Sequence, residues 1–255
     1  MTKSPALERL LARDRVIVGT GLVLMALLGW AYLIGVDYGP WFSLMAMPMR
    51  HAWQAEDFLL TLLMWAVMMV AMMTPTVAPV VLLVAMVERR GGKAAPVAMA
   101  WLALGGYFAV WMAGSAVATM LQWSLHEAGL MASAMGGLRL SIAGVTLVAV
   151  GLYQFLPSKA ACLRLCRSPV ETLAQYWKPG AAGAFRLGLR HGFYCLGCCW
   201  ALMLVLFVSG IMNLIWIAIL SALVLAEKLL PRGLLLGRVA GIGLAVWGVR
   251  LLIAT

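Results

Sequence analysis

Five cysteines lie in two short groups, and their spacing is the feature of this sequence best suited to chemistry. Cys162 and Cys166 stand four residues apart in ACLRLCRSP, and Cys195, Cys198 and Cys199 follow in RHGFYCLGCCW. An odd number of clustered cysteines does not predict a disulfide framework. Two sulfurs in a Cys-x-x-Cys spacing can converge on one soft metal ion, and both zinc and Cu(I) accept thiolate ligands. The alternative, small apolar fillers, suits an isolated cysteine better than two groups that flank one loop.

A histidine belongs to the same pattern. His191, Cys195 and Cys199 recur at every fourth position, and Met203 continues the row. Because such a row drifts by about 40° per step around a helix, a bend at a nearby glycine would help to bring the ligands together. The predicted metal ligands are Cys162, Cys166, His191, Cys195, Cys198 and Cys199, with Gln154 and Met203 as residues that could support them from nearby.

The methionines, 18 in number, form a second group of soft donors. In MWAVMMVAMMTP a row at spacing four lies on one face of an expected helix, and thioethers suit Cu(I) without losing a proton. Such a row more often serves packing, so both interpretations stay open. A second set alternates along SLMAMPMRHAW, where extended side chains would share one face. The predicted metal relay comprises Met64, Met68 and Met72 within the helix, and Met45, Met47, Met49 and His51 before it.

Six apolar runs are long enough to carry these residues across a membrane. The chain has 255 residues, of which 64% are hydrophobic and 11% charged, and its mean hydropathy is +0.99. A soluble domain could not bury so much apolar surface, whereas about 20 apolar residues span a hydrocarbon core. The sequence therefore predicts an all-α, polytopic membrane helix bundle that forms one integral membrane domain over residues 1–255. The expected spans are 16–35, 58–87, 96–122, 138–156, 197–225 and 234–253.

Two prolines interrupt the second expected span. Pro75 removes one helix hydrogen bond and clashes with the carbonyl of Ala71, and Pro79 follows one turn later. We therefore expect a kink or a break between residues 71 and 79. Discontinuous helices often mark binding sites in transporters, although proline kinks also occur in membrane proteins that transport nothing.

Lysine and arginine are distributed unevenly between the two sides of these spans. Fourteen of the 19 fall at the N-terminus, in the loop 88–95, in the loop 157–196 or at the C-terminal end. Because positive residues favour the cytoplasmic side, both termini and the long loop 157–196 are predicted to be cytoplasmic. This loop carries Cys162 and Cys166. The other three cysteines would lie at the cytoplasmic mouth of the fifth span, in a reducing compartment.

No catalytic motif accompanies these residues. The sequence contains no Walker A motif, dinucleotide fingerprint or nucleophile elbow, so non-enzymatic metal handling is favoured. The net charge of +10 belongs to short loops beside spans and does not predict nucleic-acid binding. Glu227 and Lys228, at the end of an apolar run, are expected to anchor at the membrane interface. Gly237 and Gly241, in a GxxxG spacing, indicate close helix packing, with a homo-oligomer as one use.

Four stretches together resemble a bacterial family of unknown function, described as predicted metal-binding integral membrane protein. They are MWAVMMVAMMTP, GLYQFLPSKAACLRLCRSP, GLRHGFYCLGCCWALM and GIMNLIWIAILSALVLAEK, within residues 58–230. The resemblance implies a multi-pass, metal-binding protein of the bacterial inner (cytoplasmic) membrane, with the five cysteines and His191 as the ligands. It does not extend to the methionines at 45–49.

Three functions are consistent with these patterns. The leading one is the handling of a soft transition metal, with copper as Cu(I) favoured, by transport or by delivery to a partner such as a metallochaperone or an apoprotein recipient. An integral membrane metalloenzyme or redox subunit would use the same cysteines for thiol or electron-transfer chemistry. A membrane scaffold would use them to hold a structural zinc ion. The lipid bilayer is the expected surrounding in every case.

Overall fold

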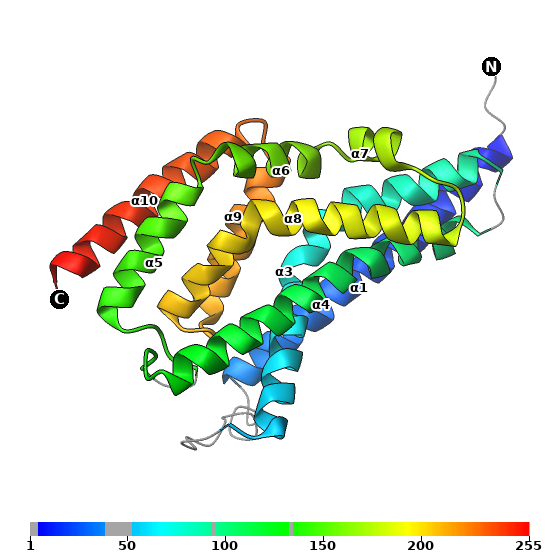
Figure 1. The fold of residues 1–255 in the computed structure, drawn as a ribbon. Helices are drawn as coiled ribbons and strands as arrows, with labels where there is room; N and C mark the ends of the chain where they lie inside the picture. Colours follow the sequence, from blue (N-terminus) through cyan, green and yellow to red (C-terminus); the bar gives the residue numbers. More distant parts are fainter. Residues whose placement is uncertain (1–4, 39–52, 93–94, 133–134, 255) are drawn as a thin grey trace.

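The computed structural model describes residues 5–38, 53–92, 95–132 and 135–254, and this part of the chain is helical throughout its regular structure. An isolated bridge joins Met131 to Leu138, and the described residues form no named strand. The prediction of an all-α fold is confirmed. The described helices are α1 (Pro5–Tyr38), α3 (Ala55–Arg90), α4 (Pro96–Glu127), α5 (Leu140–Tyr153), α6 (Pro157–Arg167), α7 (Pro169–Tyr176), α8 (Ala181–Ser209), α9 (Leu214–Leu229) and α10 (Gly233–Ile253), shown in Figure 1.

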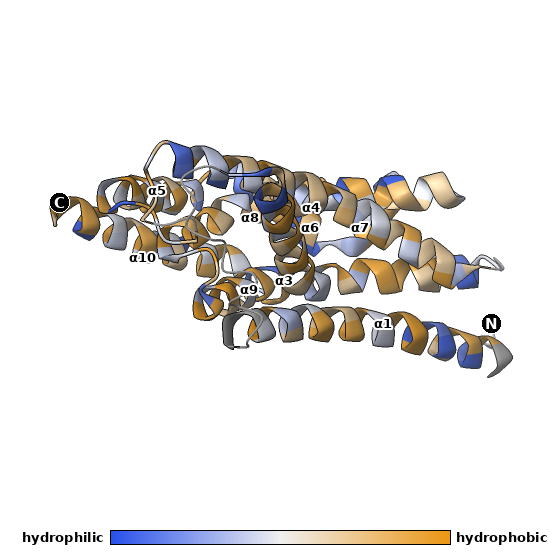
Figure 2. Cartoon of the chain, turned by 90° about the horizontal axis from the view of Figure 1, so that it is seen from below, coloured by the Kyte–Doolittle hydropathy of each residue, from blue (hydrophilic) through white to orange (hydrophobic). Residues whose placement is uncertain are grey.

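Five helices are long and apolar enough to cross a membrane, namely α1, α3, α4, α8 and α10. A sixth span exists if α5 and α6, which meet at an angle of 63°, are counted together. Figure 2 shows that apolar residues predominate along the long helices. Large apolar side chains such as Leu28, Val117 and Val239 are exposed on these helices. Such an apolar surface is expected to face lipid. The helices are thus compatible with a multi-pass membrane protein.

The fifth expected span is wrong. Residues 197–225 do not form one helix, because α8 ends at Ser209 and α9 begins at Leu214. Gly210, with φ at 95°, adopts a conformation that a side chain would disfavour. Asn213 then caps α9 by accepting a hydrogen bond from the backbone nitrogen of Trp216 at 3.3 Å. The chain therefore turns back at this point, and α8 and α9 run in opposite directions (Figure 1).

The segment 157–196, expected to be a long loop, consists mainly of helix. It contains α6, α7 and the first half of α8. The arginines of this segment lie on helices. A count of basic residues along the sequence does not distinguish arginines on helices from arginines in loops. Figure 1 shows the described N-terminal and C-terminal ends at opposite ends of the helix arrangement. The argument that placed both termini in the cytoplasm counted basic residues on the expectation that this segment is a loop. The side on which either end lies stays a prediction.

The two prolines of α3 do not break the helix. α3 is continuous from Ala55 to Arg90, and the expected discontinuity takes the form of a bend along its length (Figure 1). Hydroxyl groups bond to backbone carbonyls beside the prolines, with Thr74 Oγ1 donating to Val70 O at 2.6 Å and Thr76 Oγ1 to Met73 O at 2.8 Å. Threonine side chains and neighbouring helices commonly satisfy a proline-disturbed backbone in this way.

Small residues bring α4 and α8 into direct backbone contact. A Cβ atom at Gly188 would stand 1.9 Å from the carbonyl oxygen of Ala103, and one at Gly106 would stand 2.1 Å from that of Phe185. Only glycine permits such an approach. The contact sets how closely α8 packs on α4, and therefore the position of the residues that follow Gly188 along α8.

The GxxxG spacing of α10 serves packing within the chain. Gly241 lies against the side chain of Gln154, and a Cβ atom at Gly248 would stand 2.6 Å from the carbonyl oxygen of Gly144 on α5. The face predicted as a candidate oligomer contact is thus covered within the chain, by Glu227 and Lys159 at Gly237 and by the end of α5 at Gly241. This packing removes the sequence argument for a homo-oligomer.

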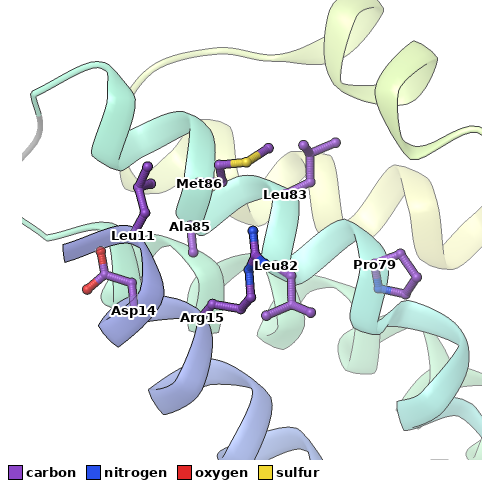
Figure 3. A pocket seen from close by; sticks show the side chains of 8 residues that line it. All are labelled: Leu11, Asp14, Arg15, Pro79, Leu82, Leu83, Ala85 and Met86. Carbon is purple, nitrogen blue, oxygen red and sulfur yellow. The ribbon is translucent and has the colours of Figure 1, made fainter. Parts of the chain in front are cut away.

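The N-terminal half of α1 is held to the end of α3 by a two-bond ion pair. Asp14 is buried, and its carboxylate accepts from Arg89 Nε at 2.5 Å and from Nη2 at 2.9 Å. Beside this pair is a hollow of about 360 Å³ between α1 and α3. Figure 3 shows Arg15 extending from α1 toward α3, between Ala85 and Leu82. None of the lining residues is a predicted metal ligand.

Candidate metal centre

Four of the predicted ligands lie in the middle of α8. His191, Cys195 and Cys199 stand one turn apart with Cys198 beside them, and none is more than 1% exposed. Their predicted location, at the cytoplasmic mouth of a span beginning near residue 197, is wrong, because the helix starts sixteen residues earlier at Ala181. The cysteines are therefore enclosed within the helix arrangement.

The second cysteine group reaches the first through α6. Cys166 is buried, and its Sγ lies 4.0 Å from His191 Nε2. Cys195, Cys198 and Cys199 are buried on the same helix as His191. The two groups that flank residues 167–194 therefore meet in space, as the sequence suggested but could not establish. We call His191, Cys166, Cys195, Cys198 and Cys199 the cysteine centre.

Cys162 occupies a different position from the other cysteines. It lies one turn before Cys166 on α6 and is half-buried. Its Sγ packs against α8 at Gly197, where a Cβ atom would stand only 2.9 Å away. The carbonyl of the same glycine accepts a hydrogen bond from Tyr153 Oη at 2.6 Å. Cys162 thus fits a close contact between α6 and α8 at the edge of the cysteine centre.

Three residues from other helices complete the surroundings of Cys195. Tyr107 of α4 places its hydroxyl 2.9 Å from Cys195 Sγ, and that hydroxyl is also 3.2 Å from Thr76 Oγ1 of α3. Lys228 of α9 donates from Nζ to the same sulfur at 2.8 Å. The thiols of Cys198 and Cys199 donate to the carbonyl of Cys195 at 3.1 and 2.9 Å. Cys195 is consequently the point at which α3, α4, α8 and α9 are connected by polar contacts.

A second buried polar group lies where α5, α6 and α9 meet. Lys159 and Glu227 have side chains that are 1% exposed, and Lys159 Nζ donates to Glu227 Oε1 at 2.8 Å. Lys159 also donates to the side-chain oxygen of Gln154, and the side-chain nitrogen of Gln154 donates to Val150 O at 3.1 Å. We call these three side chains the lysine–glutamate corner. Gln154, predicted to support the metal ligands, has its described hydrogen bonds here.

The burial of Lys159 and Lys228 was not predicted from the sequence. Glu227 and Lys228 were expected to anchor at the membrane interface, and this expectation is wrong because both are buried in the protein. Tyr107 was not singled out either. Nothing in the local sequence separates these residues from ordinary helix-end charges and membrane tyrosines. The cue that could have identified Lys228 is the combination of an ionisable residue with an apolar run that continues for most of α9.

The donor set fits a soft metal ion chemically. Four buried thiols and an imidazole are ligands that Cu(I) and Zn(II) accept, and His191 Nδ1 is a buried atom without a hydrogen-bond partner in the structure. A buried, unpaired polar atom is uncommon and calls for an explanation. Within the described ranges, however, no three His, Cys, Asp or Glu side chains already converge as a metal-ligand group. Binding would require side chains of the cysteine centre to reorient.

The residues predicted as a relay fall into two situations, and two other methionines, Met69 beside the row and Met203, predicted to support the ligands, are in a third. Met64, Met68 and Met72 are buried within the helix arrangement, at 5%, 0% and 0% exposure. Met69 and Met203 line an apolar cavity of about 520 Å³ between α3, α4 and α8. The outer set, Met45, Met47, Met49 and His51, lies outside the described residues. The burial of this row agrees with the alternative interpretation, that these methionines serve packing. Their role as a relay stays a prediction.

Comparison with known protein families gives a match over most of the chain. Residues 62–251 match the model of the PpoB2 family, which is described as copper chaperone. The matched region contains all the residues of the cysteine centre and the lysine–glutamate corner. No curated protein and no solved structure matches the chain significantly. The family description agrees with the metal-related part of the sequence resemblance and adds copper to it.

Proposed function

We propose, from the premise that the chain belongs to the PpoB2 family of copper chaperones, that it binds Cu(I) at the cysteine centre and delivers it to a protein partner. The observation that carries the proposal is that Cys166 of α6 lies 4.0 Å from His191 of α8, in the same buried region as the other cysteines of α8. Structural packing alone would not require soft donors from both helices at the same place.

The chemistry of the centre supports this assignment. Thiolate ligands select Cu(I) over harder ions, and a buried setting keeps this oxidisable ion away from water and oxidants. Two sulfur ligands satisfy Cu(I), so one thiol from α6 and one from α8 are sufficient to hold it between the helices. Release to a partner then needs the loss of one of two contacts. His191 and the remaining thiols offer further positions through which the ion can be exchanged.

We place this activity in the bacterial inner membrane. The long apolar helices would span the bilayer, and the cysteine centre would lie within the protein, shielded from lipid by α3, α4, α6 and α9. The partner would be an apoprotein recipient or a metallochaperone. Delivery does not need nucleotide hydrolysis, and the sequence carries no motif for it.

The proposal is tested by Cu(I) affinity. Full-length protein, purified in detergent without oxygen, is titrated with Cu(I) in competition with bicinchoninate. We expect one ion to bind to the wild type and Cys166→Ser to weaken binding by at least about tenfold, since a hydroxyl is a poor ligand for Cu(I). Cys162→Ser is the matched comparison, because it removes a thiol from the same helix one turn away. Wild type that binds no Cu(I), or equal losses in the two variants, would contradict the proposal.

A further inference from the structure

Lys228 brings a positive charge into the cysteine centre. Its side chain is buried near the end of α9, and Nζ donates to Cys195 Sγ at 2.8 Å. The ammonium also lies close enough to Cys166, Cys198 and Tyr107 to interact with each of them electrostatically. An ionisable residue inside a membrane protein is costly and usually marks a functional site. The donors that would hold a metal ion are thus grouped around a fixed cation.

In the part of the chain that the structure describes, this ammonium forms no ion pair with a carboxylate. The preceding residue, Glu227, forms its ion pair with Lys159, and no ion pair of Lys228 occurs among residues 5–38, 53–92, 95–132 and 135–254. A buried charge needs a partner of opposite sign. The described hydrogen bond of Lys228 goes instead to the sulfur of Cys195, a group that would also bind copper.

From this arrangement we infer that Lys228 makes the cysteine centre selective for a monovalent metal ion over a divalent one. The inference rests on the proposed function and adds a residue that determines its specificity. Two thiolates around Cu(I) carry one net negative charge, which the ammonium of Lys228 balances. The same two thiolates around a divalent ion are neutral, and the ammonium is left as an unbalanced buried charge. The charge count therefore favours Cu(I) over Zn(II).

Coulomb repulsion acts in the same direction. The repulsion between the ammonium and a bound ion is proportional to the charge of that ion, and it is strong where water is excluded. Ligand type alone does not give this discrimination, because thiolates and imidazole bind zinc as well as copper. A lysine is suited to the task because its charge is compact and sits at the end of a flexible chain.

The test compares two metals in matched variants. Full-length wild type, Lys228→Met, Lys228→Gln and Lys159→Met are purified in detergent under reducing, anaerobic conditions. Cu(I) affinity is measured against bicinchoninate, and Zn(II) affinity against a chromogenic zinc indicator. We expect Lys228→Met and Lys228→Gln to raise the ratio of Zn(II) to Cu(I) affinity by at least about tenfold, because one unit of charge repulsion is removed. Lys159→Met removes another buried lysine and should leave the ratio as in wild type.

Each outcome bears on a different claim. Wild type that binds Cu(I), with a ratio that neither neutral variant at 228 changes, overturns this inference and leaves the proposed function standing. A ratio that Lys159→Met raises equally also overturns it, since the effect would then come from general loosening of the fold. Wild type that binds neither ion contradicts the proposed function and this inference together. If Lys228→Met does not fold, Lys228→Gln decides by the same ratio.

Discussion

Two buried lysines, at neighbouring places in the fold, have opposite surroundings. In the lysine–glutamate corner, Lys159 pairs with the carboxylate of Glu227 and with the amide of Gln154. In the cysteine centre, the described hydrogen bond of Lys228 goes to a sulfur atom. Both lysines are almost inaccessible to solvent. Lys159 is paired with a carboxylate and an amide, which balance its charge and accept its hydrogen bonds. Lys228 contacts a sulfur atom that is also a candidate metal ligand.

The difference distinguishes a structural charge from a functional one. A buried ion pair with all its hydrogen bonds made holds helices together, and removing one partner leaves the other charge buried and unpaired. A buried ammonium that contacts thiols competes for the atoms a soft metal ion would bind. The comparison therefore predicts that mutations in the corner change mainly stability, while mutations in the centre change mainly metal binding.

The largest effect is expected from Lys159→Met. It leaves the carboxylate of Glu227 buried without its partner, which typically costs about 3–5 kcal/mol. Unfolding of the protein in detergent micelles, followed by circular dichroism, should show a loss of this size relative to wild type. The double variant Lys159→Met with Glu227→Leu is the control, because it removes both charges and should recover much of the stability. A single variant as stable as wild type would contradict the structural role of the corner.

Gly188→Ala should disturb the cysteine centre while leaving the corner intact. The new methyl group would stand 1.9 Å from the carbonyl oxygen of Ala103, so α8 must move away from α4. Such overpacking commonly costs about 1–3 kcal/mol, and it shifts Cys195 relative to Tyr107. The measurements are the unfolding transition and the Cu(I) affinity, both of which should fall. Gly105→Ala serves as the control, since a Cβ atom there meets nothing within 4 Å. Equal behaviour of the two variants would argue against this contact.

The double substitution Met68→Leu and Met72→Leu asks whether α3 takes part in the centre through its sulfur atoms. Both side chains are fully buried, and a swap of methionine for leucine usually costs less than about 1.5 kcal/mol. We expect unchanged Cu(I) affinity and a rate of copper loading close to that of wild type. A loading rate that falls by more than about tenfold, with the stability retained, would instead support the thioether relay.

The smallest change in stability is expected for Lys228→Met. The substitution removes a buried ammonium and leaves no carboxylate unpaired, and replacement of buried charges by apolar side chains is often neutral or stabilising. The same unfolding assay should therefore place this variant at or above wild type, in contrast with Lys159→Met. A loss as large as that of Lys159→Met would show that the two lysines have equivalent structural roles, and the comparison would fail.

The sequence identified the helical class and most of the long helices, since apolar runs of this length have few alternatives. It missed the reversal within 197–225 because the composition stays apolar through GIMN, and hydropathy does not register a turn. Gly210 and Asn213 were the local signs, one a residue suited to positive φ and the other a common N-cap. The same error made half of α8 look like a loop, because the arginines before His191 were read as loop residues.

For the metal centre, the ligand types and their grouping could be predicted, but the neighbours of the ligands could not. Cys166 and Cys195 were evident from their spacing. Their meeting depends on how α6 packs on α8, and this packing is set by contacts such as Cys162 against Gly197. Tyr107 lies 88 residues from Cys195 in the chain. Such a contact arises from the packing of α4 on α8 and has no local pattern in the sequence.

The rotation of α9 about its own axis places residues in both the lysine–glutamate corner and the cysteine centre. Glu227 and Lys228 are consecutive, and consecutive side chains on a helix diverge by about 100°, so one turn of α9 serves two sites on different sides. A deletion or insertion of one residue between Asn213 and Glu227 would rotate both side chains away from their partners at once. The chain can therefore tune either site by substitution, but it cannot change the length of α9 by one residue without losing both.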